Sequence, residues 1–413
     1  MFNELLNFVA WTSAVTVAAP SLLLSAELAA SLLHRRPRET ATAAAPTFAV
    51  LVPAHNEAIM IGRTVAGLRT QLGDTGRLLV VADNCTDATA AIARDAGAEV
   101  IERFDDARRG KGYALDFGVS HLASNPPAVV IIVDADVRVR PGSLVALARQ
   151  AAATRRAAQC IYVLSAPPEA SAGDTISHLA FTVRNHIRPL GLMRIGGVCP
   201  LFGAGMAFPW DAIATAPLAS GNIVEDLALA LDLAAGGRPP MLCPAARVDG
   251  ELVALDHGDD LTQRRRWEHG HLRTILTHAP AVLLKSIFLA RPRAALLAID
   301  VMIPPLSLLL MLSVGALAAC GLAGVLGASL LPFTILAGVF VTMSALVTIA
   351  WWRYAECQRP LRPLLAIPGY ALRKIPLYLS FFTKAEKNWN RAYRPDPSRP
   401  PTPRPVRSFK RAA

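Results

Sequence analysis

Two aspartates follow one of the most apolar stretches of the chain. Asp134 and Asp136 come at the end of the run 128–134 and are separated by one alanine. In extended backbone the side chains of residues i and i+2 project to the same side, so both carboxylates could face one ion. Ligation by oxygen alone favours Mg²⁺ or Mn²⁺ over zinc. The alternative is that these acids belong to a turn, or cap a helix, before Pro141-Gly142.

A second acidic pair begins a predicted helix. Glu225 and Asp226 open the helical run that continues through Leu227–Ala235, and two glycines follow that stretch. The helix macrodipole favours acids in the first turn, so a purely structural role explains the pair. The functional alternative is a general base, because a carboxylate within hydrogen-bond reach can take the proton of an attacking hydroxyl.

Two basic clusters could bind phosphate. The first is Gln263-Arg264-Arg265-Arg266-Trp267, which combines cations with an indole on a predicted helix over 261–276. The second is the loop Arg108-Arg109-Gly110-Lys111-Gly112. On an isolated helix or loop such charges usually face solvent or a membrane surface. If they face a site, the same cations can clamp phosphate.

Strands and helices alternate between residues 47 and 277, which predicts a right-handed parallel sheet covered by helices. Short apolar runs, typical of strands buried on both faces, occur at Thr47–Pro53, Leu78–Asp83 and Ala128–Asp134. Helical stretches occur at Ala58–Gln71, Ala88–Ala96 and Lys111–Ala123. In such sheets ligands bind at the carboxyl ends of the strands. Polar groups follow all three strands, which favours one shared binding site: His55-Asn56-Glu57, Asp83-Asn84 and Asp134-Ala135-Asp136.

Three uncharged stretches are long enough to cross a bilayer, which takes about 20 apolar residues. They are Leu5–Ala26, Val301–Val325 and Ser329–Trp352. A signal peptide is the alternative for the first, but Glu4 stands where a positive n-region is expected, which favours a retained anchor. A buried helical hairpin of a soluble core is the alternative for the other two. Their length and apolar composition disfavour it.

Basic residues flank the three stretches on one side: His34–Arg38, Arg291, Arg293, Arg353, Arg359 and Arg362. The positive-inside rule therefore predicts a multi-pass protein of the cytoplasmic (inner) membrane, with the N-terminus outside and the long middle segment in the cytosol. The apolar segment 364–382 carries Arg373 and Lys374 near its middle. This pattern predicts an amphipathic helix that lies in the membrane interface.

The composition excludes several classes of protein. Of 413 residues, 53% are hydrophobic and 18% are charged, which argues against a disordered or wholly soluble chain. Six scattered cysteines without a CxxC pair argue against a disulfide scaffold or a structural zinc site. Nine basic and two acidic residues in the Pro-rich tail 384–413 supply +7 of the net charge of +11, which favours membrane lipids as partners. Only 6% of residues are aromatic and no recognition-helix pattern occurs, which disfavours nucleic acid.

Seven short motifs, taken in chain order, resemble those of the membrane-embedded family 2 glycosyltransferases, which include the cellulose, chitin and hyaluronan synthases. The resemblance covers about residues 48–267 and extends to the flanking apolar spans. The motifs are PAHNE at 53–57, ADN at 82–84, GKGYALD at 110–116, DAD at 134–136, FGAGMAF at 202–208, VED at 224–226 and QRRRW at 263–267.

The resemblance implies a GT-A fold, an α/β architecture with a Rossmann-like mixed and mostly parallel sheet, and a nucleotide-diphosphate sugar as donor, with a UDP-sugar favoured. It assigns to donor binding the residues His55, Glu57, Asp83, Lys111 and Asp134. It assigns Asp136, together with Asp134, to a Mg²⁺ or Mn²⁺ ion, and Asp226 to the catalytic base with Glu225 beside it. It assigns to the diphosphate and the acceptor the residues Gln263, Arg266 and Trp267, and it brings the backbone at Gly203 and Gly205 near the acceptor.

The sequence thus predicts an inverting glycosyltransferase that acts on a growing polysaccharide or a lipid-linked saccharide, in exopolysaccharide or envelope glycan synthesis. Three spans with a short outer turn leave little material for a polymer channel, so an export or synthase partner subunit is expected. One alternative is a glycolipid synthase that adds a single sugar to a membrane lipid. Another is a catalytically silent sugar-nucleotide-binding subunit of an export complex, which the intact motifs disfavour.

The predicted organisation has seven parts. They are a transmembrane helix (1–33), a linker (34–46), a GT-A domain (47–277), an interfacial segment (278–300), two transmembrane helices (301–352), an interfacial amphipathic segment (353–383) and a basic tail (384–413).

Overall fold

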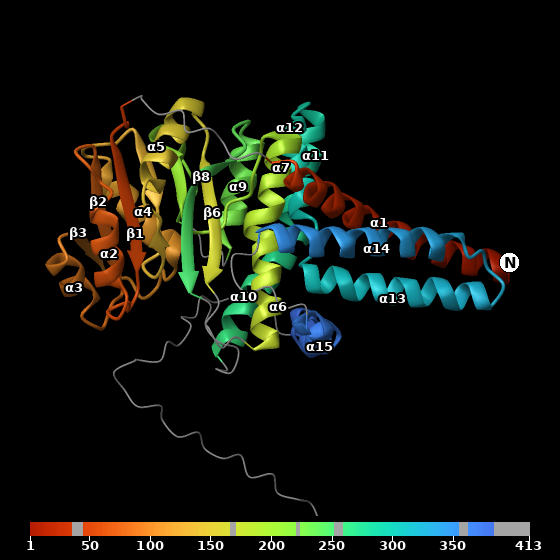
Figure 1. The fold of residues 1–413 in the computed structure, drawn as a ribbon. Helices are drawn as coiled ribbons and strands as arrows, with labels where there is room; N and C mark the ends of the chain where they lie inside the picture. Colours follow the sequence, from red (N-terminus) through yellow and green to blue (C-terminus); the bar gives the residue numbers. More distant parts are fainter. Residues whose placement is uncertain (35–43, 166–170, 220–223, 252–258, 355–361, 384–413) are drawn as a thin grey trace, which may run out of the picture.

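A mixed sheet of eight strands forms the centre of the part of the chain that the computed structural model describes (Figure 1). The description covers residues 1–34, 44–165, 171–219, 224–251, 259–354 and 362–383, except for the side chains of residues 251, 259–264, 362 and 363. The predicted linker residues 35–43 and the predicted tail lie outside it. The strands are β1 (Phe48–Ala54), β2 (Gly76–Asp83), β3 (Glu99–Arg103), β4 (Val129–Ile132), β5 (Arg138–Val139), β6 (Ala158–Ser165), β7 (Met206–Pro209) and β8 (Met241–Glu251).

The strand order β3-β2-β1-β4-β7-β6-β8-β5 combines two halves. The first four strands in this order are parallel, whereas β7 is antiparallel to both β4 and β6. The three predicted apolar runs correspond to β1, β2 and β4. Their side chains alternate between two cores, with Val50 on one face of the sheet and Leu51 on the other. The predicted α/β class and mostly parallel sheet are therefore confirmed.

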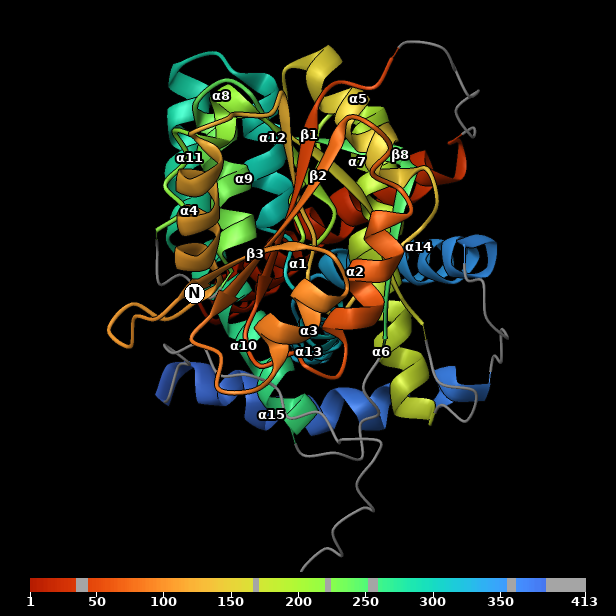
Figure 2. The same ribbon diagram turned by 90° about the vertical axis from the view of Figure 1, so that its left-hand side faces the viewer.

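Helices cover both faces of the sheet (Figure 2). One core packs the strands against α2 (Ile61–Arg69), α3 (Thr89–Asp95) and α5 (Ser143–Thr154). The opposite core packs them against α4 (Lys111–Leu122), α7 (Arg188–Gly196), α9 (Glu225–Ala235) and α12 (Pro292–Val301). The remaining elements of this region are α6 (Ala172–Thr182), the π-helical turn η1 (Val183–Ile187), α8 (Trp210–Ile213), α10 (Asp259–Leu276) and α11 (His278–Phe288).

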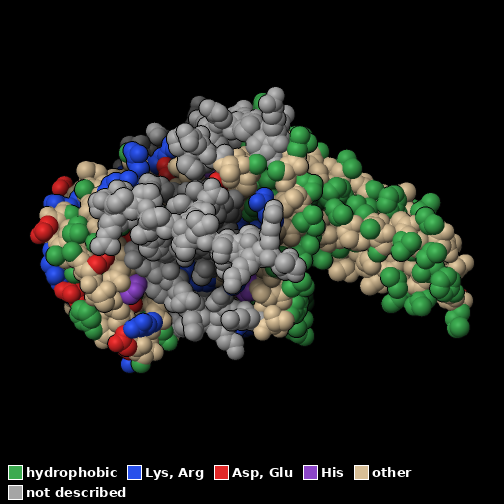
Figure 3. Space-filling model, turned by 90° about the horizontal axis from the view of Figure 1, so that it is seen from below, with side chains coloured by type: hydrophobic (Ala, Val, Ile, Leu, Met, Phe, Trp, Pro, Cys, Tyr) green, Lys and Arg blue, Asp and Glu red, His purple; other side chains and the backbone are tan. Residues whose placement is uncertain are grey.

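Three long apolar helices extend from the sheet as a bundle (Figure 1). They are α1 (Phe2–Leu32), α13 (Leu306–Val325) and α14 (Leu331–Tyr354), each long and apolar enough to cross a membrane. Their outer surface exposes apolar side chains such as Val325, Val341 and Ile349, and Figure 3 shows hydrophobic side chains over the visible face of the bundle. An apolar surface of this kind is stable when lipid covers it. The N-terminus lies at the far end of the bundle from the sheet.

The helix boundaries differ from the prediction at two places. The second apolar stretch was predicted to begin at Val301, but α12 ends there and α13 begins at Leu306, because Pro304 and Pro305 stand between them. Within the predicted interfacial segment 278–300, α12 buries Leu297 and Ala298 against the sheet region and so is part of its core.

The predicted amphipathic segment forms a short 3₁₀ turn (Arg362–Ala366) and the helix α15 (Ile367–Thr383). Figures 1 and 2 show α15 lying across the axis of the bundle at its sheet-proximal end. It buries Tyr370 and Tyr378 and exposes Leu372 and Leu379. This division into two faces is the one that the sequence predicts for a helix in a membrane interface.

A buried ion-pair network joins the bundle to the sheet region. Arg188 of α7 donates to Glu27 of α1 at 2.9 Å and to Asp300 of α12 at 2.6 Å. Both carboxylates are almost completely buried. Close by, α7 approaches α1 so tightly that a Cβ on Gly191 would lie 1.9 Å from the carbonyl oxygen of Glu27. The bundle is therefore fixed to the sheet region and is not a loose tether.

Replacing Arg188 by methionine leaves two buried carboxylates without their cation. Breaking a buried ion pair in this way typically costs about 3–5 kcal/mol, so we expect a clearly lower melting temperature of the full-length protein in detergent. The matched control is Arg194→Met, because Arg194 lies on the exposed side of the same helix. Equal melting temperatures for the two variants would contradict the anchoring role of Arg188.

Candidate active site

A cavity of about 360 Å³ lies at the carboxyl ends of β1, β2 and β4. Its wall includes every predicted site residue whose side chain is described: His55, Glu57, Asp83, Lys111, Asp134, Asp136, Glu225, Asp226, Arg266 and Trp267. The side chain of the remaining predicted residue, Gln263, lies outside the described part of the structure. Residues separated by more than two hundred positions thus meet around one hollow, as the sequence predicted for the strand ends.

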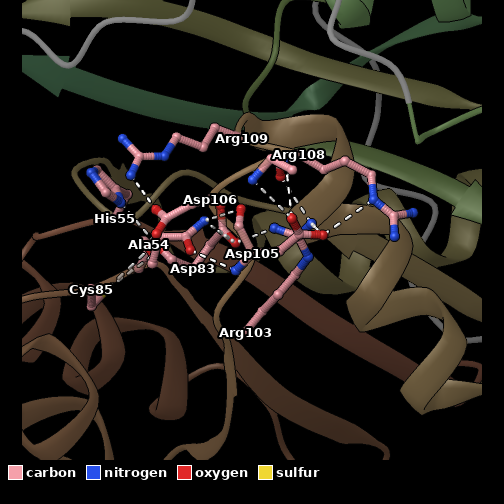
Figure 4. Close-up of polar contacts among 11 residues, drawn as sticks. Ala54, His55, Asp83, Cys85, Arg103, Asp105, Asp106, Arg108 and Arg109 are labelled. Atoms are coloured by element: carbon pink, nitrogen blue, oxygen red, sulfur yellow. Dashed lines mark hydrogen bonds and ion pairs between the residues drawn. The ribbon is translucent and has the colours of Figure 1, made fainter.

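The loops after β1 and β2 are tied together at one end of the cavity, here called the sheet end. His55 donates through Nδ1 to the backbone oxygen of Asp83 at 2.7 Å, and the carboxylate of Asp83 accepts from Arg103 at 2.7 Å (Figure 4). The backbone N–H of Glu57 donates to the hydroxyl of Thr89 at 2.7 Å. Asp83 is buried, so its pairing with Arg103 offsets the cost of removing the carboxylate from water.

Two arginines of the predicted basic loop do not reach the cavity. Arg108 pairs with Asp105 at 3.2 Å and Arg109 pairs with Asp106, and both arginine side chains are more than 60% exposed (Figure 4). They therefore take the solvent-facing alternative that the sequence left open. Gly110 and Lys111 of this loop line the cavity, and Lys111 brings its cation to it.

Lys111 connects three elements. It begins α4, and its ammonium donates to the carboxylate of Asp134 and, at 2.7 Å, to the backbone oxygen of Gly203. Burial alone would lower the pKa of Lys111, but the attraction of Asp134 and Glu225 outweighs it and raises the pKa above its usual value. The lysine is therefore held as a cation at the centre of the cavity.

Asp134 and Asp136 come after the end of β4, with Asp136 in a turn, so they are not part of the strand from which their common direction was predicted. β4 ends at Ile132, and both residues nevertheless line the cavity. Burial, together with repulsion from Asp136, raises the pKa of Asp134 in spite of its pairing with Lys111. A divalent cation would relieve this repulsion, and the oxygen-only donor set fits Mg²⁺ or Mn²⁺.

No cluster of three or more His, Cys, Asp or Glu side chains within metal-binding reach occurs among the described residues. A cation at Asp134 and Asp136 would therefore complete its shell with phosphate oxygens and water, which is the usual arrangement for Mg²⁺ in phosphate-binding sites.

Glu225 and Asp226 occupy the first turn of α9, where the sequence predicted them. Burial and repulsion from Asp226 raise the pKa of Glu225 to about 7, although Lys111 opposes the shift. Burial also raises the pKa of Asp226, and Lys111 and Arg184 oppose it. The two neighbouring acids thus differ in surroundings, because two cations oppose the shift at Asp226 and one opposes it at Glu225.

The glycine-rich segment 202–208 brings the backbone at Gly203 close to Asp226. Gly203 has a φ of +86°, and a Cβ there would lie 3.3 Å from Asp226 Oδ2 and 3.5 Å from Lys111 Nζ. Gly205 instead packs against Cys160, whose sulfur would lie 2.1 Å from an added Cβ. Of the two glycines expected near the acceptor, only Gly203 is therefore beside the catalytic groups.

At its other end, here called the bundle end, the cavity reaches the long helices. The wall there includes Leu24 of α1, Pro304–Ser307 before and in α13, and Tyr370 and Lys374 of α15. Lys374 pairs with Glu268 of α10 and donates to Ser307 at 3.2 Å.

An aromatic wall connects the two ends of the cavity. Trp267 lies 6.4 Å from Phe181, which makes an edge-to-face contact with Tyr162 at 5.2 Å between ring centroids. All three rings line the cavity. Sequence reasoning found Trp267 through its motif but missed the other two rings, together with Arg184, Glu268 and Lys374, because none of them stands in a recognisable pattern.

Comparison with known protein families agrees with this arrangement. A family model described as glycosyl transferase family group 2 matches residues 129–354, which is more than half of the chain, and one described as glycosyl transferase family 2 matches residues 49–203. The chain belongs to the family 2 glycosyltransferases. The two matches together cover residues 49–354, which include all residues of the cavity wall except Leu24 of α1 and Tyr370 and Lys374 of α15.

Individual relatives support the fold of this glycosyltransferase. The mannosyltransferase PcManGT from Pyrobaculum calidifontis, solved with GDP-Man and Mn²⁺, has a TM-score of 0.56 at 19% identity and covers 92% of this chain and 100% of its own. The 4,4'-diaponeurosporenoate glycosyltransferase of Staphylococcus aureus (strain MRSA252) is 36% identical over 91 residues, which is 21% of this chain. The chain spans about a quarter (23%) of the length of that curated relative. The predicted GT-A fold is confirmed.

The surroundings of the two acids predict different effects of removing their charges. We expect Asp226→Asn to lower glycosyl transfer by about 10²–10⁴-fold, because the amide cannot accept a proton. Glu225, with its pKa near 7, is largely protonated at pH 6, so Glu225→Gln at that pH should stay within about tenfold of the wild type. The measurement is the initial rate of each variant at pH 6. A larger loss in Glu225→Gln than in Asp226→Asn would exchange the two roles.

Proposed function

We propose that this glycosyltransferase moves a sugar from a nucleotide-diphosphate sugar to a hydroxyl of an amphiphilic acceptor, a membrane lipid or a lipid-linked saccharide, at the membrane surface. The observation that carries the proposal is the continuity of one cavity. It runs from the carboxylates after β4 to the ends of the apolar helices at Leu24 and Pro304–Ser307. An acceptor anchored in lipid can enter such a cavity from the bundle end while the donor occupies the sheet end.

The donor is assigned to the sheet end on the chemistry of its residues. His55, Glu57 and Asp83 offer hydrogen-bonding groups to a nucleoside, which the resemblance to the family also implies for these positions. Lys111 and Arg266 lie in the same cavity wall as the carboxylates, and both cations suit a diphosphate. Uridine is the favoured base, and GDP-Man in the neighbour from P. calidifontis makes guanosine the second candidate.

Asp134 and Asp136 would hold a Mg²⁺ or Mn²⁺ ion. When bound, such an ion offsets the negative charge that grows on the leaving diphosphate. Lys111 and Arg266 stabilise the same charge from the protein side. The repulsion between the two neighbouring aspartates supports this assignment, because it is relieved when a cation lies between them.

The proposed reaction is a single displacement. As the acceptor oxygen bonds to the anomeric carbon, its proton passes to Asp226 and the bond from that carbon to the diphosphate oxygen breaks. A base on the side opposite the leaving group inverts the configuration of the sugar. Trp267 and the adjoining rings Phe181 and Tyr162 offer apolar faces to the acceptor, and Gln263 is assigned there on its motif alone.

The membrane topology belongs to the same proposal. With three candidate spans and the N-terminus at the far end of the bundle, the catalytic region faces the cytosol and the N-terminus lies outside the inner membrane. A growing polysaccharide is the less favoured acceptor, because three spans offer little material for a polymer channel. Synthesis of a secreted polymer would require a partner subunit.

The proposal is tested with a panel of nucleotide sugars, including UDP-glucose and GDP-mannose, and the full-length protein in detergent with Mn²⁺. We expect release of nucleoside diphosphate from one donor, stimulated by an amphiphilic acceptor such as decyl glucoside and nearly absent in Asp226→Asn. The product should be one chloroform-soluble species, whereas a ladder of sizes would support polymerisation. Equal release by wild type and Asp226→Asn would favour a different base or a silent subunit.

The ion adds a separate prediction. EDTA should lower the wild-type rate by about two orders of magnitude or more, because the leaving group loses its main source of charge stabilisation. Asp136→Ala should be similarly impaired at all Mn²⁺ concentrations. Asp106→Ala is the control, because Asp106 is exposed and lies outside the cavity wall. Unchanged rates in EDTA would remove the metal from the proposal.

A further inference from the structure

The helix α15 contributes polar side chains to the bundle end of the cavity. Lys374, near its middle, pairs with Glu268 of α10 and donates to the hydroxyl of Ser307 at 3.2 Å. One turn earlier, the hydroxyl of Tyr370 shares a hydrogen bond of 2.8 Å with the hydroxyl of Ser177 on α6. All five side chains belong to the cavity wall. Polar groups from four helices therefore meet where the apolar helices also line the cavity.

Burial separates the two neighbouring cations of α15. Arg373 is exposed, whereas the side chain of Lys374 is only 13% exposed and pairs with a carboxylate, that of Glu268, which is equally buried. A buried ion pair adds little net stability, because the cost of removing both charges from water offsets their attraction. The place of this pair in the cavity wall points instead to a role in ligand binding.

The hydrogen-bonding capacity of the pair is not used up by the protein. An ammonium can donate three hydrogen bonds, and the acceptors of Lys374 among the described residues are two, Glu268 Oε1 and Ser307 Oγ. The other carboxylate oxygen, Glu268 Oε2, is buried and has no donor in the described part of the chain. Buried polar atoms without a partner are uncommon, because each one costs the free energy of removing it from water. The pair thus offers one donor and one acceptor to a ligand.

We propose that Lys374 and Glu268 form a subsite for a neutral, hydroxyl-bearing headgroup of the acceptor, such as a sugar or glycerol head. A hydroxyl can accept from the ammonium and donate to the carboxylate, so one group satisfies both. An ionised phosphate or carboxylate can only accept hydrogen bonds, and Glu268 would repel it. Trp267, the residue before Glu268, lines the same cavity and offers its ring to the same headgroup. The inference rests on the proposed function, because the headgroup is that of the acceptor which enters from the bundle end.

The test compares two acceptors that differ by one charge, decyl glucoside and decyl glucuronide. Full-length protein is used in a polyoxyethylene detergent, which carries no sugar, with Mn²⁺ and the nucleotide sugar that the wild type turns over fastest. The measurement is kcat/KM for sugar transfer to each acceptor at pH 7. We expect the wild type to favour decyl glucoside by about tenfold or more, because the glucuronide brings a second carboxylate to Glu268.

Two variants separate the roles of the pair. Glu268→Gln removes the charge and keeps the size of the side chain, so the preference for decyl glucoside should fall below about threefold, because the repulsion is lost. Lys374→Met should raise the KM for decyl glucoside by about tenfold, because a donor to the headgroup is lost, while the KM for the nucleotide sugar changes less than about threefold. The matched control is Arg373→Met, which removes a cation from the exposed side of the same helix and should leave transfer to both acceptors within about twofold of the wild type.

The ratio of kcat/KM for the two acceptors does not depend on folding, because a smaller folded fraction lowers both values equally. A ratio in Glu268→Gln equal to that of the wild type would overturn the inference, and so would a wild type that does not favour the neutral acceptor. If the wild type transfers sugar to neither acceptor, or if Asp226→Asn transfers as fast as the wild type, the proposed function has failed and this inference fails with it. If the wild type transfers sugar to decyl glucoside but Glu268→Gln keeps the wild-type ratio, this inference alone has failed.

Discussion

The site depends on one buried cation, the ammonium of Lys111. It joins the start of α4, the turn after β4 and the backbone at Gly203, so three segments that are far apart in the sequence share one contact. Without a positive charge there, Asp134, Glu225 and Asp226 would face one another in a buried space. Each of these acids already has a raised pKa, chiefly because of burial. The geometry of the cavity therefore follows from the need to balance these charges.

The second constraint is the attachment of the bundle to the sheet region. Arg188 fixes α1 to α7 and α12, and the pairing of Lys374 with Glu268 fixes α15 to α10. These contacts place the ends of the apolar helices in the wall of the same cavity that contains the carboxylates. The proposed acceptor, which is itself anchored in the membrane, rests on this arrangement.

Much of this architecture can be predicted from the sequence, because apolar runs and short motifs are local signals. Continuous apolar runs located β1, β2 and β4, and the polar groups that follow them do meet at one edge. β3 was not predicted because it lies at the edge of the sheet and has no continuous apolar run. The backbone path at Asp134 and Asp136, and the place of Arg184 in the cavity wall, depend on tertiary packing that spacing along the chain does not encode.

The most direct test of the account is a structure of the full-length protein in a lipid nanodisc with UDP or GDP and Mn²⁺, at a resolution that shows the diphosphate. The account predicts the diphosphate beside Lys111 and Arg266, the ion at Asp136, and lipid around the apolar bundle with an opening toward Leu24. A nucleotide bound elsewhere, or a diphosphate out of reach of both cations, would contradict the central claim that one cavity joins donor and membrane.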